Sequence, residues 1–320
     1  MSRLSEIRLP RKAWEKLGKT RITRKTRITR KTRITRITQN TYLHKTEMKK
    51  ALFYFLAFMA VQLIVGGIAS VVLNKWFPTV SSTDSTALLI TVGVSNVILI
   101  ALFLLLRWYT VSRTYIRSRP WVTLTWTALL ALGSVIPSTW LEEQLPKSWQ
   151  LNILGEEMAN MLRSTEGYFV ICMLAPLAEE IIFRGAIISA LMKWFAGRSG
   201  NEATWGSLTK GEWIAVGCSA VLFAVGHVNP AQIPHALIFG ILLGWLFVKT
   251  GSIVPGLLVH WINNTVAYVM VNVFPTLPID APLKDYVGGS DAAVARAVIC
   301  SLMIFLPALY QLIRIPREKA

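Results

Sequence analysis

Long apolar runs separated by short polar stretches make up most of the chain from residue 51 onward. A run of about 20 apolar residues can cross the hydrocarbon core of a bilayer, which is about 30 Å thick, as an α-helix. Eight runs reach or approach that length, although the fifth and sixth have only about 15 residues each. The runs lie at residues 51–73, 87–106, 121–140, 168–194, 213–227, 234–248, 252–273 and 296–313. This pattern predicts an all-α, polytopic membrane protein with about eight transmembrane helices.

The composition agrees with a membrane protein. The chain is 53% hydrophobic and 16% charged, whereas a soluble domain is about one quarter charged. Its three cysteines, Cys172, Cys218 and Cys300, lie in separate apolar runs, which indicates buried free thiols and gives no sign of a disulfide framework or a zinc cluster. We expect a multi-pass protein of the bacterial inner (plasma) membrane, with the lipid bilayer as its surroundings.

The strong basic charge belongs to the N-terminal tail. The net charge is +17, and residues 1–50 supply +14 of it, from 17 Lys and Arg against 3 Asp and Glu. A near-exact hexapeptide repeat starts at Arg21-Ile-Thr-Arg-Lys-Thr26 and recurs twice. We interpret residues 1–47 as a disordered, low-complexity tail. The alternative is a polybasic arm that binds anionic lipid or nucleic acid, but a nucleic-acid partner is not expected, because nothing aromatic or structured accompanies the charge.

A third interpretation of the tail is a misplaced start codon. Met48-Lys49-Lys50, followed directly by an apolar run, resembles a bacterial start. The predicted transmembrane domain is therefore residues 48–320.

Charge in the loops predicts the orientation, because cytoplasmic loops carry an excess of Lys and Arg. With the N-terminus in the cytoplasm and eight alternating spans, eleven Lys and Arg beyond residue 50 lie inside and five lie outside. We therefore predict that both termini are cytoplasmic, and this prediction does not depend on the tail.

The fourth run contains three charged residues in an otherwise apolar stretch: Glu179, Glu180 and Arg184. Each ionisable group costs roughly 2.5–3.5 kcal/mol to insert into a membrane, so it is retained where it faces the bundle interior and has a partner. Glu180 and Arg184 are four residues apart, share a helix face and can pair. Glu179 lies about 100° round the helix, which leaves its carboxylate available for chemistry or for a metal.

Two of the four histidines, His227 and His260, are candidates for chemistry within the apolar runs. His227 ends the fifth run, and His260 lies in the seventh, where Asn264 shares its helix face. A lone membrane histidine is as often a helix–helix hydrogen-bond partner as a catalyst. Combined with Glu179, however, the two histidines form a set suited to activating water. The carboxylates of residues 141–167 we interpret instead as parts of a solvated outer loop without chemistry.

Three motifs follow one another in these runs: Glu179-Glu180-x-x-x-Arg184, Phe223-x-x-x-His227 and His260-x-x-x-Asn264. Together they resemble the CPBP intramembrane proteases, which include the type II CAAX prenyl endopeptidases and the bacteriocin-processing (Abi) proteins. The resemblance covers about residues 168–272, which would be the protease core. It implies an endopeptidase that hydrolyses a peptide bond of a membrane-associated protein or peptide. The first three runs and the last show no pattern that matches the family.

The resemblance also implies roles for the motif residues. Glu179 would be the general base that activates water, and His227 would orient that water or donate a proton. His260 and Asn264 would stabilise the oxyanion. The supporting partners would be Glu180 and Arg184. Amide hydrolysis requires these functions, because it needs a deprotonated nucleophile and a stabilised oxyanion.

The cofactor and two other functions stay open at this point. Glu179, His227 and His260 could furnish a His₂Glu site for a divalent metal such as zinc, although we favour a metal-free glutamate mechanism. A non-catalytic immunity, resistance or interaction protein would keep the fold and tolerate the loss of Glu179. A transporter with a proton relay would show inverted repeats or broken helices in matching halves, and the sequence contains neither.

Overall fold

The computed structural model describes residues 46–81, 84–109, 115–146, 149, 151, 155–195, 207–227 and 229–317. From Met48 onward the chain forms one compact unit. The predicted basic tail, residues 1–47, lies outside the described residues except for Thr46 and Glu47. Its interpretation therefore stays a prediction.

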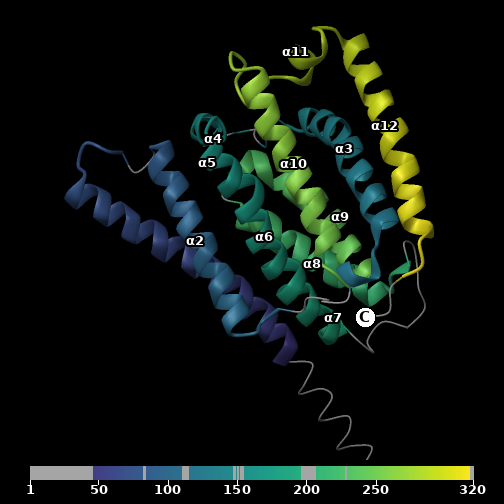
Figure 1. Ribbon diagram of the computed structural model, residues 1–320, viewed down its shortest axis with the longest axis horizontal. Coiled ribbons are helices and arrows are strands. Elements are labelled where there is room, and N and C mark those ends of the chain that lie inside the picture. Colours follow the sequence, from purple (N-terminus) through teal and green to yellow (C-terminus); the bar gives the residue numbers. More distant parts are fainter. Residues whose placement is uncertain are drawn as a thin grey trace, which may run out of the picture. The chain divides into compact units, whose positions relative to one another are not determined.

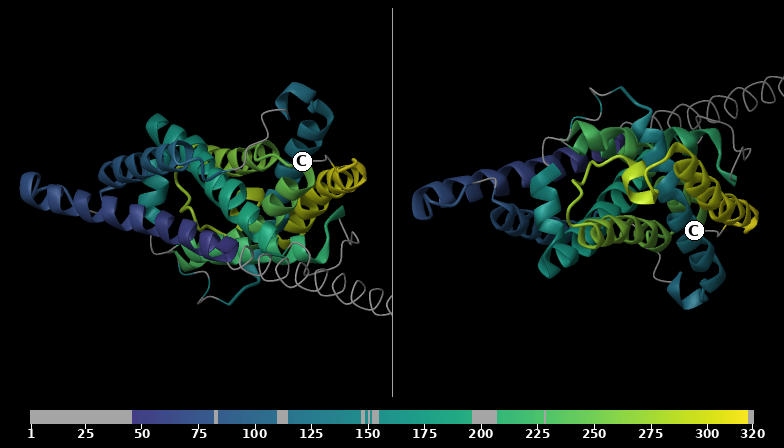
Figure 2. Two further views of the ribbon diagram at one scale, coloured as in Figure 1. Left: turned by 90° about the horizontal axis from the view of Figure 1, so that it is seen from below. Right: turned by 90° about the horizontal axis from the view of Figure 1, so that it is seen from above.

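Helices account for the regular structure of the described residues, which confirms the predicted all-α class (Figures 1 and 2). In chain order they are the N-terminal helix Thr46–Trp76, α2 (Ser85–Leu105), η1 (Ile116–Ser118), α3 (Trp121–Glu143), α4 (Gly155–Leu162), a continuous stretch from Thr165 to Phe195, α8 (Lys210–Gly226), η6 (Pro230–Gln232), α9 (Ile233–Thr250), α10 (Val254–Val273), α11 (Leu283–Val287) and α12 (Asp291–Arg314).

Six of the described helices are long and apolar enough to cross a membrane: Thr46–Trp76, Ser85–Leu105, Trp121–Glu143, Pro230–Thr250, Val254–Val273 and Asp291–Arg314. The prediction of a multi-pass membrane protein is therefore confirmed. The count of eight and the cytoplasmic position of both termini stay predictions. The other two predicted runs correspond to α8, which has 17 residues, and to the stretch that begins at Thr165.

The stretch that carries the first motif alternates between α-helix and π-helix. Its consecutive parts are α5 (Thr165–Gly167), the π-helical η3 (Tyr168–Leu174), α6 (Ala175–Glu179), the π-helical η4 (Glu180–Ile188) and α7 (Ser189–Phe195). π-helical turns are rare in proteins, and those that occur are often found at functional sites. Here the Ile171 carbonyl accepts a hydrogen bond from Asn264 Nδ2 at 3.0 Å, and the Phe183 carbonyl accepts one from Ser219 Oγ at 3.2 Å. These bonds join the first-motif stretch to α10 and α8, which carry the other motifs.

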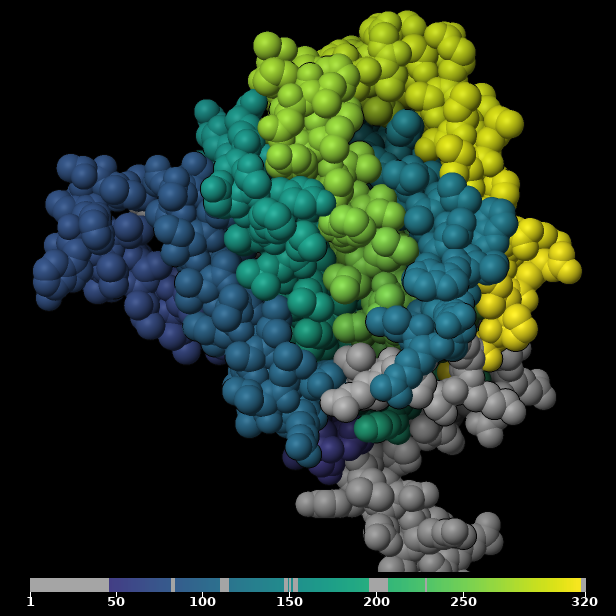
Figure 3. All heavy atoms as spheres, viewed as in Figure 1, coloured from purple at the N-terminus to yellow at the C-terminus, as the bar shows by residue number. Residues whose placement is uncertain are grey.

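Burial divides the helices into an inner and an outer set. All residues of η4 are buried, and α6 lies between α2 and α10 (Figure 1). On one face of the molecule, α10, α3 and α12 lie side by side (Figure 3). The N-terminal helix instead exposes apolar side chains such as Leu63, which is 71% exposed. Such a surface is expected where lipid tails cover the protein.

The prediction of buried cysteines is confirmed for Cys172 and is wrong for Cys218 and Cys300, which are exposed. An apolar run that crosses a membrane has an outward-facing side as well as an inward-facing one, so membership of the run does not decide burial.

The pair α3–α12 depends on close backbone contact at Gly133. A Cβ atom added to Gly133 would lie 2.6 Å from the backbone nitrogen of Phe305. Ser301 Oγ donates a hydrogen bond to the Gly133 carbonyl at 3.2 Å. Small residues at a contact between membrane helices permit this approach.

We expect Gly133→Ala to destabilise the protein by roughly 1–3 kcal/mol, the usual cost of overpacking, because the backbone of α12 must move. Denaturant unfolding in detergent measures this. The matched control is Gly217→Ala in α8, where an added Cβ meets nothing within 4 Å. The control should be neutral or slightly stabilising, and equal losses in both variants would contradict the close contact.

Candidate active site

The side chains of the three motifs meet in one cavity of about 340 Å³. Glu179 of α6, His227 at the end of α8, and His260 and Asn264 of α10 all line it. Most other lining residues are apolar and come from α2, α4, η3 and α9. The structure thus brings together the four predicted catalytic residues in one cavity. Its lining also includes the polar side chains of Gln232, His235 and Asn263, and polar groups that converge within an apolar lining are common in binding sites.

The two adjacent glutamates have different environments. The Glu179 side chain borders the cavity and is 19% exposed, whereas Glu180 is fully buried. Arg184 Nη1 lies 3.0 Å from Glu180 Oε1, as the four-residue spacing predicted. Glu180 therefore belongs to a buried ion pair, and Glu179 is the carboxylate that faces the cavity.

His260 lies between the two glutamates. Its Nδ1–H donates to Glu180 Oε1 at 3.2 Å, and its Nε2 lies 3.6 Å from Glu179 Oε2. The second distance exceeds a normal N–H···O hydrogen bond, so the two atoms face each other across a short gap. The sequence predicted Arg184 as the partner of Glu180 but not His260, because helical spacing does not report contacts between different helices.

Phe223, the first residue of the second motif, packs against the charged and aromatic groups of the site. The guanidinium carbon of Arg184 lies 4.5 Å from the centre of the Phe223 ring, a cation–π contact that helps to offset desolvation. The ring also meets His227 edge-on at 4.8 Å between centroids. Among the described residues, Nε of Arg184 has no hydrogen-bond acceptor, so the aromatic face is an important part of its surroundings.

Hydrogen bonds fix which atoms of His227 and Asn264 remain for chemistry. His227 Nδ1 lies 2.9 Å from the Phe223 carbonyl; because a carbonyl only accepts, Nδ1 carries the proton and Nε2 of the neutral ring is an acceptor. Asn264 Nδ2 donates one hydrogen to the Ile171 carbonyl, and its second N–H is not used in that bond. The cavity thus contains a carboxylate, an imidazole acceptor and an amide donor.

The residues predicted to hold a divalent metal, if one takes part, are Glu179, His227 and His260. Within the described part of the chain, no three His, Cys, Asp or Glu side chains are placed to hold a metal ion. Two of the imidazole nitrogens, Nδ1 of His227 and Nδ1 of His260, bond to protein oxygens. These bonds involve only Nδ1, so Nε2 is the remaining nitrogen of each ring. A metal-free glutamate mechanism and a His₂Glu site for a divalent metal at Glu179, His227 and His260 both stay predictions.

One pair that borders the site was missed from the sequence. His235 lines the cavity, and its Nδ1 lies 2.6 Å from Glu142 Oε1, across 93 residues of chain. The prediction that residues 141–167 form a solvated outer loop is wrong for Glu142 and Glu143, because both belong to the last turn of α3, and Glu143 accepts a hydrogen bond from the Leu283 backbone. The available signal was a histidine near the start of the sixth apolar run.

Residues 163–266 match a family model described as type II CAAX prenyl endopeptidase Rce1-like. The matched segment includes all three motifs and confirms the predicted resemblance to the CAAX-type CPBP proteases. At the level of the family, the match supports a protease that lies in a lipid bilayer and acts on a peptide substrate. Comparison with curated proteins and with solved structures found no match.

Arg184→Met should lower the free energy of unfolding by about 3–5 kcal/mol, because Glu180 would remain buried without its cation. Denaturant unfolding in detergent measures this loss, and Lys75→Met, at an exposed position, is the control, with an expected change of about 0–1 kcal/mol. The double variant Glu180→Gln/Arg184→Met should lose less than the sum of the single variants. Additive losses would contradict direct pairing.

Proposed function

We propose that this chain, which carries a type II CAAX prenyl endopeptidase (Rce1-like) segment at residues 163–266, is an intramembrane endopeptidase that uses a glutamate-activated water. The observation that supports this most is the shared cavity of Glu179, His227, His260 and Asn264. Of the two glutamates of the first motif, only Glu179 borders the cavity. The substrate would be a membrane-associated protein or peptide, since the cavity lies among helices with apolar outer surfaces.

The reaction begins with water beside Glu179. The carboxylate of Glu179 accepts a proton from the water, and His227 Nε2 accepts a hydrogen bond that orients it. The water oxygen then forms a bond to the carbonyl carbon of the scissile peptide. Negative charge develops on the carbonyl oxygen, and the second N–H of Asn264 stabilises it. The His260 imidazole adds a second donor from Nε2 when both of its ring nitrogens carry protons, because its Nδ1–H stays on Glu180.

The C–N bond then breaks, and the leaving nitrogen takes up the proton that Glu179 accepted, either directly or through His227. One water is consumed, and one carboxyl terminus and one amino terminus are formed. Glu180 and Arg184 do not contact the substrate in this scheme. They orient His260 through its Nδ1–H, so that Nε2 faces Glu179 and the reacting carbonyl.

Glu179→Gln should reduce peptide cleavage by purified protein in detergent about 10²–10⁴-fold, the usual contribution of a general base. Unfolding should change little, because the Glu179 carboxylate is partly exposed and lies 3.6 Å from His260 Nε2, which exceeds a normal hydrogen bond. The matched control is Glu156→Gln at an exposed position of α4, which should cleave like the wild type. We propose that a chelator has no effect on the wild type.

Two outcomes would overturn this mechanism. Full cleavage by Glu179→Gln would exclude Glu179 as the base. Loss of wild-type cleavage with chelator, restored by zinc, would establish a metal enzyme. If the wild type cleaves no peptide, a cellular phenotype that is insensitive to Glu179→Gln would support the non-catalytic alternative.

A further inference from the structure

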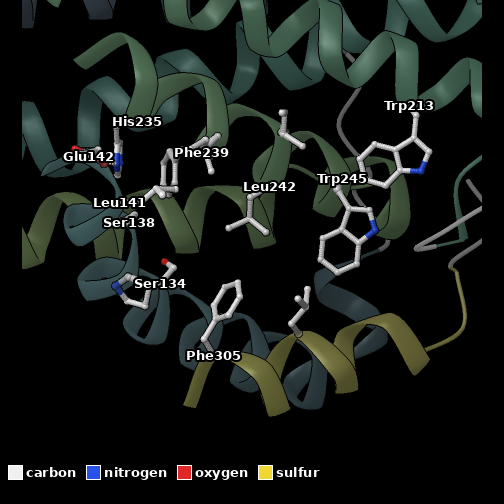
Figure 4. A pocket seen from close by; sticks show the side chains of 14 residues that line it. Ser134, Ser138, Leu141, Glu142, Trp213, His235, Phe239, Leu242, Trp245 and Phe305 are labelled. Atoms are coloured by element: carbon white, nitrogen blue, oxygen red, sulfur yellow. Dashed lines mark hydrogen bonds and ion pairs between the residues drawn. The ribbon is translucent and has the colours of Figure 1, made fainter. Parts of the chain in front are cut away.

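A second cavity adjoins the catalytic one. It is a groove of about 360 Å³ between α3, α9, α12 and the start of α8. Two side chains of α9, His235 and Phe239, line both the groove and the catalytic cavity. In Figure 4, His235 and Glu142 lie together at one end of the groove, and Trp213 and Trp245 lie at the other. The groove therefore shares a wall with the cavity in which Glu179 lies.

The groove is chemically suited to hydrocarbon. Apart from His235 and Glu142, its polar side-chain groups are the hydroxyls of Ser134 and Ser138 and the two indoles. Both hydroxyls donate to carbonyls of their own helix, at 2.7 Å and 2.9 Å. A polypeptide backbone would lose its hydrogen bonds in such a place at a considerable cost. Apolar side chains, in contrast, would enter favourably.

A row of contacts connects the polar end of the groove to the catalytic histidine. Glu142 accepts from His235 at 2.6 Å, and the His235 ring stacks on Phe239 with centroids 5.2 Å apart. Phe239 then meets His260 edge-on at 5.3 Å. The His235–Glu142 bond joins α9 to α3, so it closes the end of the groove next to the catalytic cavity.

We propose that this groove is a specificity subsite for apolar side chains of the substrate polypeptide, and that the His235–Glu142 pair determines where the apolar segment ends and the scissile bond begins. The proposal rests on the proposed peptidase function. A polypeptide whose backbone lies at Glu179 has neighbouring side chains to place, and the groove shares a wall with that position. A lipid tail would also fit the groove, but its presence would not make cleavage depend on the peptide sequence.

Another apolar hollow provides an internal control. It has a volume of about 600 Å³ and lies between η3, α6 and α10, with Leu258 and Trp261 in its wall. It shares no lining residue with the catalytic cavity. Filling this hollow should not change substrate choice.

The test compares peptides that share the two residues joined by the scissile bond. The three residues beyond these, on the amino-terminal or the carboxyl-terminal side, are either all leucine or all serine. Leu242→Trp fills the groove. It should raise KM at least about tenfold for the one leucine peptide whose leucines enter the groove, and it should leave KM of the serine peptides unchanged. Leu258→Trp, the matched control, should change neither. The same peptides can be titrated onto Glu179→Gln protein by fluorescence anisotropy, so that binding selectivity is measured without cleavage.

The pair is tested with His235→Ala and His235→Gln. His235→Ala should bring the KM ratio of leucine to serine peptides towards one, whereas His235→Gln, whose amide can still donate to Glu142, should keep most of the preference. A merely structural role would lower kcat or stability for both peptides alike.

Two results would overturn the proposal. One is a leucine preference, in cleavage or binding, that is equal in wild type and Leu242→Trp. The other is a co-purifying lipid that Leu242→Trp displaces without changing peptide selectivity, which would make the groove a lipid site. In either case, cleavage that is lost in Glu179→Gln would leave the proposed peptidase function intact.

Discussion

The buried ion pair between Glu180 and Arg184 is the interaction on which the site depends. Taking two charges out of water costs several kcal/mol each, so each charge needs the other close by. Glu180 accepts from His260 of α10, and Arg184 lies over Phe223 of α8. Gly256 lets α10 approach, because a Cβ there would lie 2.7 Å from Glu180 Oε2. One ion pair thus holds together the three elements that carry the motifs.

This arrangement gives the two adjacent carboxylates different tasks. Glu180 is fully buried and structural, and Glu179 borders the cavity across a 3.6 Å gap from His260. The π-helical segments on either side of α6 contribute as well, because side chains of α8 and α10 bond to carbonyls within them. The helix that bears the proposed base is therefore fixed at both ends of α6, as a preorganised catalytic group requires.

Chemistry and substrate choice would be separated in space. The catalytic cavity contains the polar groups, and the groove beside it is apolar, with His235 and Phe239 as the shared wall. In a membrane, lipid is as apolar as the substrate side chains, so burial alone gives little selectivity. Shape and the position of the polar end at Glu142 would then decide which segment of a substrate enters.

The sequence by itself determined the all-α membrane class. A long apolar run in a bilayer has no water to bond to, and a helix satisfies its backbone hydrogen bonds within the run. It also determined the Glu180–Arg184 pair, because both residues lie on one helix and their spacing places them together. The contacts of His260 with Glu180 and of His235 with Glu142 join residues 80 and 93 positions apart. Helical periodicity is local and does not specify which helices face each other. Only the tertiary packing decided these contacts, the role of Phe223, and the groove beside the catalytic cavity.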